Sequence, residues 1–125
     1  MRTRVLTILL LFGAAATPLA ADARSDAKKQ VEFGITVAQR GLWREAIYRW
    51  QRAAQIDPKY AEAYNDLAIA YEHEGDLEKA RVAYEKALEI EPNNALIKQN
   101  YELFKEINDR TTRKDTPDDP GNQNP

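Results

Sequence analysis

The chain repeats its own pattern at a spacing of 34 residues. A shift by that number places residues of like kind on one another: Gly41 on Gly75, Ala46 on Ala80, Trp50 on Tyr84, Ala53 on Ala87, Ile56 on Ile90 and Pro58 on Pro92. Self-similarity at a fixed spacing of this size is typical of repeat proteins, in which each unit is one supersecondary structure that buries its apolar face against the next unit. The spacing therefore predicts a short array of stacked units.

Inside each unit the apolar residues follow the period of an α-helix. The second unit has one such set before Gly75 and another after it: Tyr64, Leu67, Ala68 and Tyr71, then Leu77, Ala80, Tyr84, Ala87 and Leu88. Residues with this spacing gather on one side of a helix. Gly75 can take the left-handed conformation that ends a helix, and Pro92 cannot continue the next one. The first unit has the same organisation, with helices predicted over residues 27–40 and 43–56.

The second unit, residues 61–94, resembles the tetratricopeptide repeat family. The matching residues are Tyr64-x2-Leu67-Ala68-x2-Tyr71, followed by Ala80-x3-Tyr84, Ala87 and Pro92. The first unit, residues 27–60, departs from the family pattern at Gln30 and Val37, where large aromatic residues are usual. The resemblance implies an all-α fold of two helix-turn-helix repeats plus a C-terminal capping helix, which is a short α-solenoid. It also implies a protein that binds other proteins.

A further helix is predicted from Ala95 to about Asn108, as part of a capping segment over residues 95–109. Its apolar residues are Leu96, Ile97, Tyr101, Phe104 and Ile107, and its outer face has Lys98, Glu102, Lys105 and Glu106. A terminal repeat element must cover its neighbour and present a polar outer surface. The last stretch, residues 110–125, is polar and has too few large apolar residues to offset its ordering entropy, so it is predicted to be disordered.

The N-terminal residues have the pattern of a secretory signal peptide. Arg2 and Arg4 precede an apolar run over residues 5–16, and small residues follow it. That run is shorter than the roughly 20 residues that a membrane-spanning helix needs. The sequence therefore predicts a signal peptide over residues 1–23, cleaved after Ala21 or Ala23, and a small exported bacterial protein that is periplasmic or secreted. The chain has no cysteine, so neither a disulfide nor a lipid-bearing N-terminal cysteine is expected.

The side chains that enzymes use are scarce after residue 23. This part has one serine, Ser25, one histidine, His73, and no cysteine, so a nucleophile–base pair has no candidate members. A zinc site needs three or four ligands, which a single histidine among carboxylates does not supply. We therefore expect no enzyme, no cofactor and no metal. From Arg24 onward, 16 basic and 19 acidic side chains give a net charge of −3, which gives no overall electrostatic attraction to nucleic acid.

The resemblance also indicates where a partner would bind, because the first helix of each repeat lines the hollow side of such arrays. The candidate partner-binding residues are then Val31, Ile35, Asn65, Ile69, His73 and Leu103. The four apolar members of this set make a strip with polar edges, which suits an extended or helical peptide. An equal alternative is that some of these four belong to the core. The heat-shock adaptors of the family hold a C-terminal carboxylate with lysine and asparagine, where this chain has Val31, Ile35 and Asp66, so that specificity is not expected.

The two units differ in net charge. Residues 27–60 contain seven basic and three acidic side chains, a net of +4, and residues 61–94 contain three basic and nine acidic ones, a net of −6. Opposite charges of this kind either help one unit to stack on the other or steer association with a partner. An alternative function is therefore a structural module that self-assembles weakly or docks in a complex through its charged, uncapped repeat ends.

Overall fold

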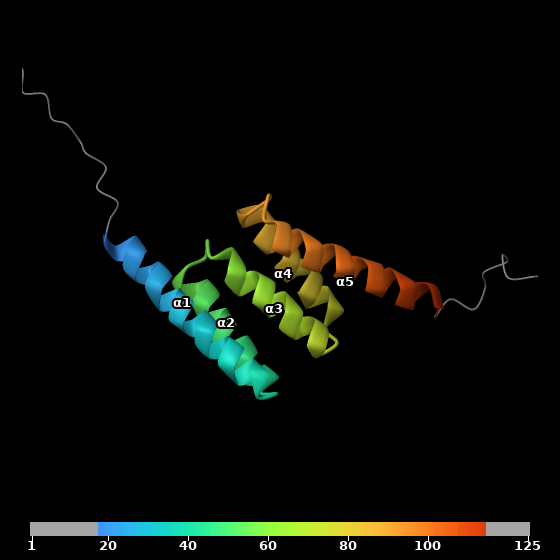
Figure 1. Ribbon diagram of the computed structural model, residues 1–125, viewed down its shortest axis with the longest axis horizontal. Helices are drawn as coiled ribbons and strands as arrows, with labels where there is room; N and C mark the ends of the chain where they lie inside the picture. Colours follow the sequence, from blue (N-terminus) through green and yellow to red (C-terminus); the bar gives the residue numbers. More distant parts are fainter. Residues whose placement is uncertain (1–17, 115–125) are drawn as a thin grey trace, which may run out of the picture.

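The computed structural model describes residues 18–114, which form five α-helices and no strand (Figure 1). The helices are α1 (Pro18–Gln39), α2 (Trp43–Ile56), α3 (Ala61–His73), α4 (Leu77–Ile90) and α5 (Ala95–Lys114). The first two helices make one antiparallel pair, the next two make a second pair, and α5 packs beside α4. Most of the predicted signal peptide, residues 1–17, lies outside the described residues, as do residues 115–125.

The same glycine turn closes the first helix of each pair. Gly41 has φ +79° and Gly75 has φ +77°, in the left-handed region that glycine adopts without a steric penalty. After Gly75, the Asp76 amide donates to the Tyr71 carbonyl at 2.8 Å, and after Gly41 the next amide donates in the same way to the Val37 carbonyl at 3.0 Å. These bonds satisfy carbonyl groups that a helix end would otherwise leave unpaired. The glycine and proline positions therefore predicted the bounds of α2, the break between α3 and α4, and the end of α4 before Pro92.

Small residues allow the two helices of each pair to approach closely. Ala46 and Ala80 are fully buried, and the large rings beside them, Trp50 and Tyr84, are 3% and 1% exposed. Gly34 is required by this packing, since a Cβ atom added there would lie 2.8 Å from Trp50 Cδ1. The Trp50 indole N–H donates to the Val31 carbonyl at 3.1 Å. The core is therefore built where the 34-residue pattern alternates small residues with large aromatic ones.

Two predicted helix ends differ from the structure. The first helix begins at Pro18 instead of residue 27, and proline is compatible with the first turn because its missing N–H has no helical partner there. Arg24 holds this extension to the loop between α2 and α3 through an ion pair with Asp57 and a bond to the Lys59 carbonyl at 3.2 Å. The predicted end at Asn108 is also wrong, since α5 continues to Lys114. Thus residues 110–114 of the predicted disordered tail are helical.

The last helix covers the second pair with aromatic side chains. Phe104 is 3% exposed, and the Tyr84 ring lies 5.6 Å from that of Tyr101 and 5.5 Å from that of Phe104 between centroids. On its other side, Glu102 and Lys98 are exposed. The amide of Asn100 donates to the Asn65 side-chain oxygen at 3.0 Å, which links α5 to α3. Because α1 also packs on α3, the first helices of successive units follow one another along one side of the array.

Candidate partner-binding groove

Three exposed apolar residues recur at the same place in successive units. Ile35, Ile69 and Leu103 are separated by 34 residues each and lie on α1, α3 and α5. They are 37%, 38% and 55% exposed, although branched apolar side chains are usually found inside a protein. We call these three residues the apolar strip. They are the part of the predicted partner-binding set that presents apolar surface.

Two other members of the predicted set serve the fold. Val31 is 1% exposed, so the prediction that its side chain lines an open groove is wrong, and the alternative that it belongs to the core applies. Val31 precedes Ile35 by one helical turn, where α1 is covered by its packing on the neighbouring helices. Asn65 is 5% exposed and joins α3 to α5 by accepting the hydrogen bond from Asn100. Helical periodicity could not distinguish these inward positions from the neighbouring outward ones.

A hollow of about 260 Å³ lies between α1 and α3, next to the apolar strip. We call it the α1–α3 hollow, and its lining residues are Ile35, Ala38, Gln39, Trp43, Trp50, Asp66 and Ile69. The residues of α1 and α3 form its sides, and the two tryptophans come from α2. The sequence predicted Ile35 and Ile69 here but missed Trp43 and Asp66. The signal that could have found Asp66 is its position directly after Asn65, on the helix that lines the hollow side.

The carboxyl group of Asp66 is only partly satisfied. Its Oδ1 atom accepts a hydrogen bond of 3.3 Å from the Asn65 amide, whereas Oδ2 is buried and has no hydrogen-bond partner. Burial, together with the nearby charge of Glu62, raises the pKa of Asp66 to about 7 from 3.8, because both effects disfavour the charged form. The repeat register explains the missing partner. On α5, Asn100 is equivalent to Asp66, and it donates a hydrogen bond to Asn65 of the preceding unit. The residue of α1 that Asp66 would reach in the same way is Val31, whose side chain is apolar.

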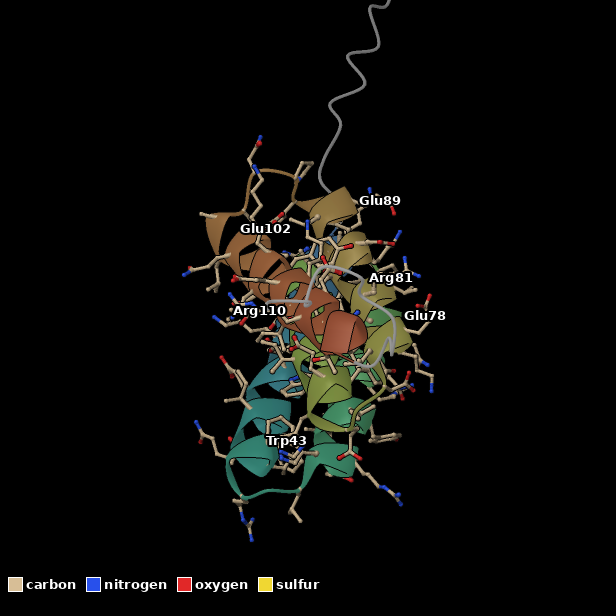
Figure 2. The ribbon with its side chains drawn as sticks, turned by 90° about the vertical axis from the view of Figure 1, so that its right-hand side faces the viewer. Trp43, Glu78, Arg81, Glu89, Glu102 and Arg110 are labelled. Atoms are coloured by element: carbon tan, nitrogen blue, oxygen red, sulfur yellow. The ribbon has the colours of Figure 1, made fainter. Side chains whose placement is uncertain are left out.

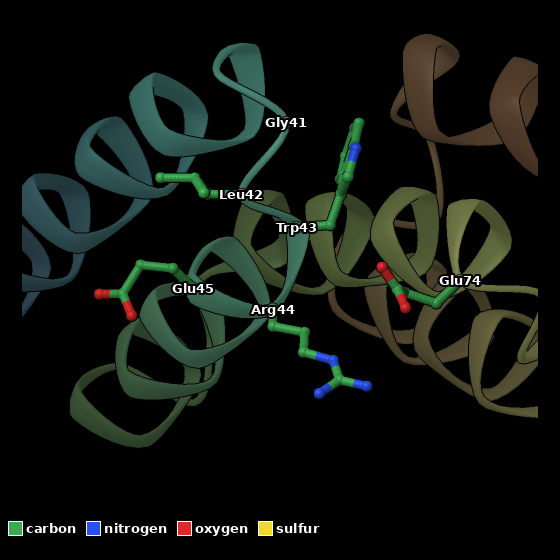
Figure 3. A pocket seen from close by; sticks show the side chains of 6 residues that line it. All are labelled: Gly41, Leu42, Trp43, Arg44, Glu45 and Glu74. Atoms are coloured by element: carbon green, nitrogen blue, oxygen red, sulfur yellow. The ribbon is translucent and has the colours of Figure 1, made fainter.

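His73 lies at the end of α3 and stacks on Trp43. The two ring centroids are 4.0 Å apart and the ring planes differ by 20°. His73 is exposed and Trp43 half-buried. Trp43 also lines a second hollow at the turn between α1 and α2. In Figure 3 the Trp43 indole and the Arg44 side chain point in opposite directions, and Glu74 lies across the hollow from both. The role that the structure gives to His73 is therefore to hold the Trp43 ring beside the α1–α3 hollow.

Carboxylates border the groove on α3. Glu62 accepts a hydrogen bond from the Tyr60 hydroxyl at 2.8 Å, and Glu72 accepts one from the Tyr84 hydroxyl. Burial and the bond to Glu72 raise the pKa of the Tyr84 phenol, so its hydrogen remains available as a donor. Neither carboxylate is paired with a lysine or arginine among residues 18–114. These two carboxylates of α3 therefore keep their negative charge without a cationic partner in the described part of the chain.

The charges on the outer face of α4 are paired within that helix. Arg81 bonds to Glu78 and lies 3.1 Å from Glu85, and Lys86 lies 3.2 Å from Glu89. Figure 2 shows Glu78, Arg81 and Glu89 along this face.

Within the described range, no three histidine, cysteine or acidic side chains gather as a metal site would require. None of the helices between residues 18 and 114 has the length and apolar character of a membrane-spanning segment.

Comparison with known families and structures agrees with this architecture. Residues 37–75 match a model described as TPR repeat, and residues 61–94 match a model described as tetratricopeptide repeat. Residues 37–94 consist of tetratricopeptide repeats. The chain is also similar to the crystal structure of the Sgt2 TPR domain from Aspergillus fumigatus, with a TM-score of 0.64 and 20% sequence identity over 89% of this chain and 93% of that one. The predicted all-α solenoid of tetratricopeptide type is confirmed.

Two relatives show how far the similarity extends. The type IV pilus assembly protein PilF of Pseudomonas aeruginosa is 32% identical over 89 residues, covering 70% of this chain and 35% of PilF. The small glutamine-rich tetratricopeptide repeat-containing protein 2 of Mycosarcoma maydis is 35% identical over 69 residues, covering 55% of this chain and 20% of that protein. The chain thus spans about a third or less of these relatives. Tetratricopeptide repeats are generally protein–protein interaction modules, and their fold is typically a non-catalytic scaffold.

Proposed function

We propose that this protein is an exported adaptor of the cell envelope that binds a peptide segment or a helix of another protein along its groove. The observation on which the proposal depends is the apolar strip, which exposes a branched side chain at equivalent positions of α1, α3 and α5. An apolar row bordered by polar side chains suits a peptide that lies across it. The α1–α3 hollow beside the strip offers a place for one side chain of that peptide.

The envelope location is supported by the sequence of residues 1–23, with its basic start, apolar run and small residues. A relative named for type IV pilus assembly fits the same location. Fractionation of bacterial cells that express the full chain tests the location. We expect a shortened protein in the periplasm or the medium, and a full-length protein found only in the cytoplasm would contradict it.

The groove is tested by the double variant Ile35→Asp plus Ile69→Asp. Both side chains are more than a third exposed, so the variant should fold, and circular dichroism checks this. Two charges placed on the strip should abolish binding, since a charge is costly to bury in an apolar contact. The matched control is Val82→Asp, which adds a charge to an exposed apolar position on α4, away from the groove. Crosslinking in periplasmic extract with mass spectrometry gives the partners, and a folded double variant that keeps all of them would refute the groove.

A second candidate function is self-assembly through the uncapped first unit. Phe33 is 46% exposed, whereas Leu67, which holds the equivalent place in the second unit, is 6% exposed. In the described part of the chain no helix precedes α1 to cover Phe33, and the Arg49 guanidinium lies over its ring, 4.4 Å from the centroid. Analytical ultracentrifugation at low and high salt distinguishes this candidate from the adaptor. A monomer under both conditions would remove it.

A further inference from the structure

We propose that the α1–α3 hollow is the subsite for a lysine or arginine side chain of the bound peptide, with its aliphatic part between Ile35 and Ile69 and its cationic head on Asp66. This inference depends on the proposed peptide binding, and it adds the chemical class of the partner. It identifies the bound segment as an apolar peptide with a basic residue at the position that faces this hollow.

The walls of the hollow match the shape of such a side chain. Ile35, Ala38 and Ile69 are apolar, and Trp43 presents a ring that the stacked His73 holds in place at 4.0 Å. Lysine and arginine have a long aliphatic stem that packs on apolar surface and a charged head that needs a polar partner. A cation close to the face of a tryptophan gains additional electrostatic attraction. A stem between the isoleucines therefore places the head among groups that favour a positive charge.

The carboxyl group of Asp66 selects the sign of that charge. A buried carboxyl oxygen without a partner is unfavourable, and Oδ2 of Asp66 is such an atom. An apolar occupant would leave it unpaired, and an acidic occupant would be repelled by Asp66 and Glu62. A lysine or arginine head satisfies it with a charge-assisted hydrogen bond. The terminal torsion of aspartate is broad, so the carboxyl can turn an oxygen toward the hollow when the cation enters.

Among residues 18–114, no lysine or arginine forms an ion pair with this carboxyl. On α3 the charged group that acts on Asp66 is Glu62, and His73 lies at the end of that helix against Trp43. The titratable groups from the loop before α3 and from α4 are the phenols of Tyr60 and Tyr84. The residues of α1 and α2 that line the hollow, with Gln39 as their polar member, have no ionisable side chain, and the α5 residue linked to α3 is the neutral Asn100. The described part of the chain therefore leaves this carboxyl open to a positive group from a bound peptide.

The first test selects peptides from a random dodecapeptide library displayed on phage. The protein is used in three forms: wild type, Asp66→Asn, and Glu32→Gln as the matched control. Glu32 holds the position of Asp66 in the first unit, 34 residues earlier, but its side chain is 63% exposed and lies 4.0 Å from Lys28. We expect lysine or arginine to be enriched at one position of the peptides that bind the wild type and the Glu32→Gln variant, and this enrichment to be lost with Asp66→Asn.

The outcomes of this selection separate the two proposals. Bound peptides without a basic residue, or with the same basic residue in all three selections, overturn the subsite and leave the groove function standing. If no peptide is retained by the wild type, both the groove function and the subsite are overturned.

The second test uses the strongest selected peptide and a copy with norleucine in place of its lysine or arginine. Calorimetry at about pH 8 should give an affinity about tenfold lower for the norleucine copy with the wild type, since a charge-assisted hydrogen bond contributes roughly this much. The Asp66→Asn variant should bind both peptides alike. Wild-type affinity for the basic peptide should also rise between about pH 6 and about pH 8, where the Asp66 carboxyl loses its proton. Equal affinities of the two peptides for the wild type overturn the proposal without reference to any variant.

Discussion

Replacement of Asp66 by asparagine should stabilise the fold, and the gain should depend on pH. The pKa of Asp66 is about 7 in the folded protein against an ordinary value of 3.8. The folded state therefore keeps this proton to higher pH than the unfolded chain does. It follows that the free energy of unfolding decreases as the pH rises from about 4 to about 7 and is level above that range.

The magnitude follows from the same two values. Each pKa unit corresponds to about 1.4 kcal/mol, so the rise from 3.8 to about 7 corresponds to roughly 4 kcal/mol of stability lost by the wild type at neutral pH. Asparagine has nearly the shape of protonated aspartate but never becomes charged. The Asp66→Asn variant should therefore have the stability of the wild type near pH 4 and exceed it by up to about 4 kcal/mol near pH 8.

Urea denaturation followed by far-ultraviolet circular dichroism measures this effect. The two proteins are compared at several values between about pH 5 and about pH 8, and the difference between their unfolding free energies is plotted against pH, because contributions of other carboxylates then cancel. The Glu32→Gln variant serves as the control and should show no such trend, because Glu32 is exposed. A difference between Asp66→Asn and wild type that stays constant across this range would refute the reasoning.

Three further substitutions test the packing that positions the groove, each by its urea midpoint. Gly34→Ala should destabilise the fold by about 1–3 kcal/mol, because its methyl group would overlap the buried Trp50 ring; an unchanged midpoint would show that the ring moves freely. Gly75→Ala should cost about 1–2 kcal/mol through its positive φ alone, since nothing surrounds the added methyl group, and a stabilised variant would contradict this. Asn100→Ala should cost about 1–3 kcal/mol because it leaves the oxygen of Asn65 without its donor; a loss close to zero would mean that α5 is held by its aromatic contacts alone.

Sequence reasoning predicted the elements whose limits are set by local chemistry. Gly41 and Gly75 adopt the positive φ that their role as helix ends requires, and Pro58 and Pro92 follow closely after α2 and α4. The ends of the array were predicted less well. Pro18 stands at the start of α1 but lies inside the predicted signal peptide, and no breaking residue marks the end of α5. The first proline after α5 is Pro117, and nothing between it and Asn108 interrupts a helix.

The candidate site was predicted in part for a similar reason. Ile35, Ile69 and Leu103 are exposed at equivalent positions of the repeat, and Ile35 and Ile69 line one hollow. The same register assigned Val31 to the groove, but the packing of the helices buries its side chain in the core, which the sequence of α1 alone does not reveal. The sequence distinguishes Asp66 only as a departure from the carboxylate-binding pattern of the heat-shock adaptors. Its unusual environment depends on contacts between helices and could be predicted only from the folded structure.

The differences between equivalent residues indicate where the groove has its specificity. On α5, Asn100 bonds to Asn65 of α3, so the junction between those two helices is closed by a satisfied pair of amides. On α3 the residue equivalent to Asn100 is Asp66, and the residue of α1 equivalent to its expected partner is Val31. The side chain of Val31 cannot form a hydrogen bond, so Oδ2 of Asp66 has no partner. The two junctions share one backbone pattern but differ in polar chemistry, because the α1–α3 junction keeps an unpartnered carboxyl beside an apolar hollow. A buried group that lowers stability at neutral pH is typical of positions retained for function. We therefore expect substitutions at Asp66 to change which peptide is bound, and substitutions at Asn100 to change stability with little effect on that choice.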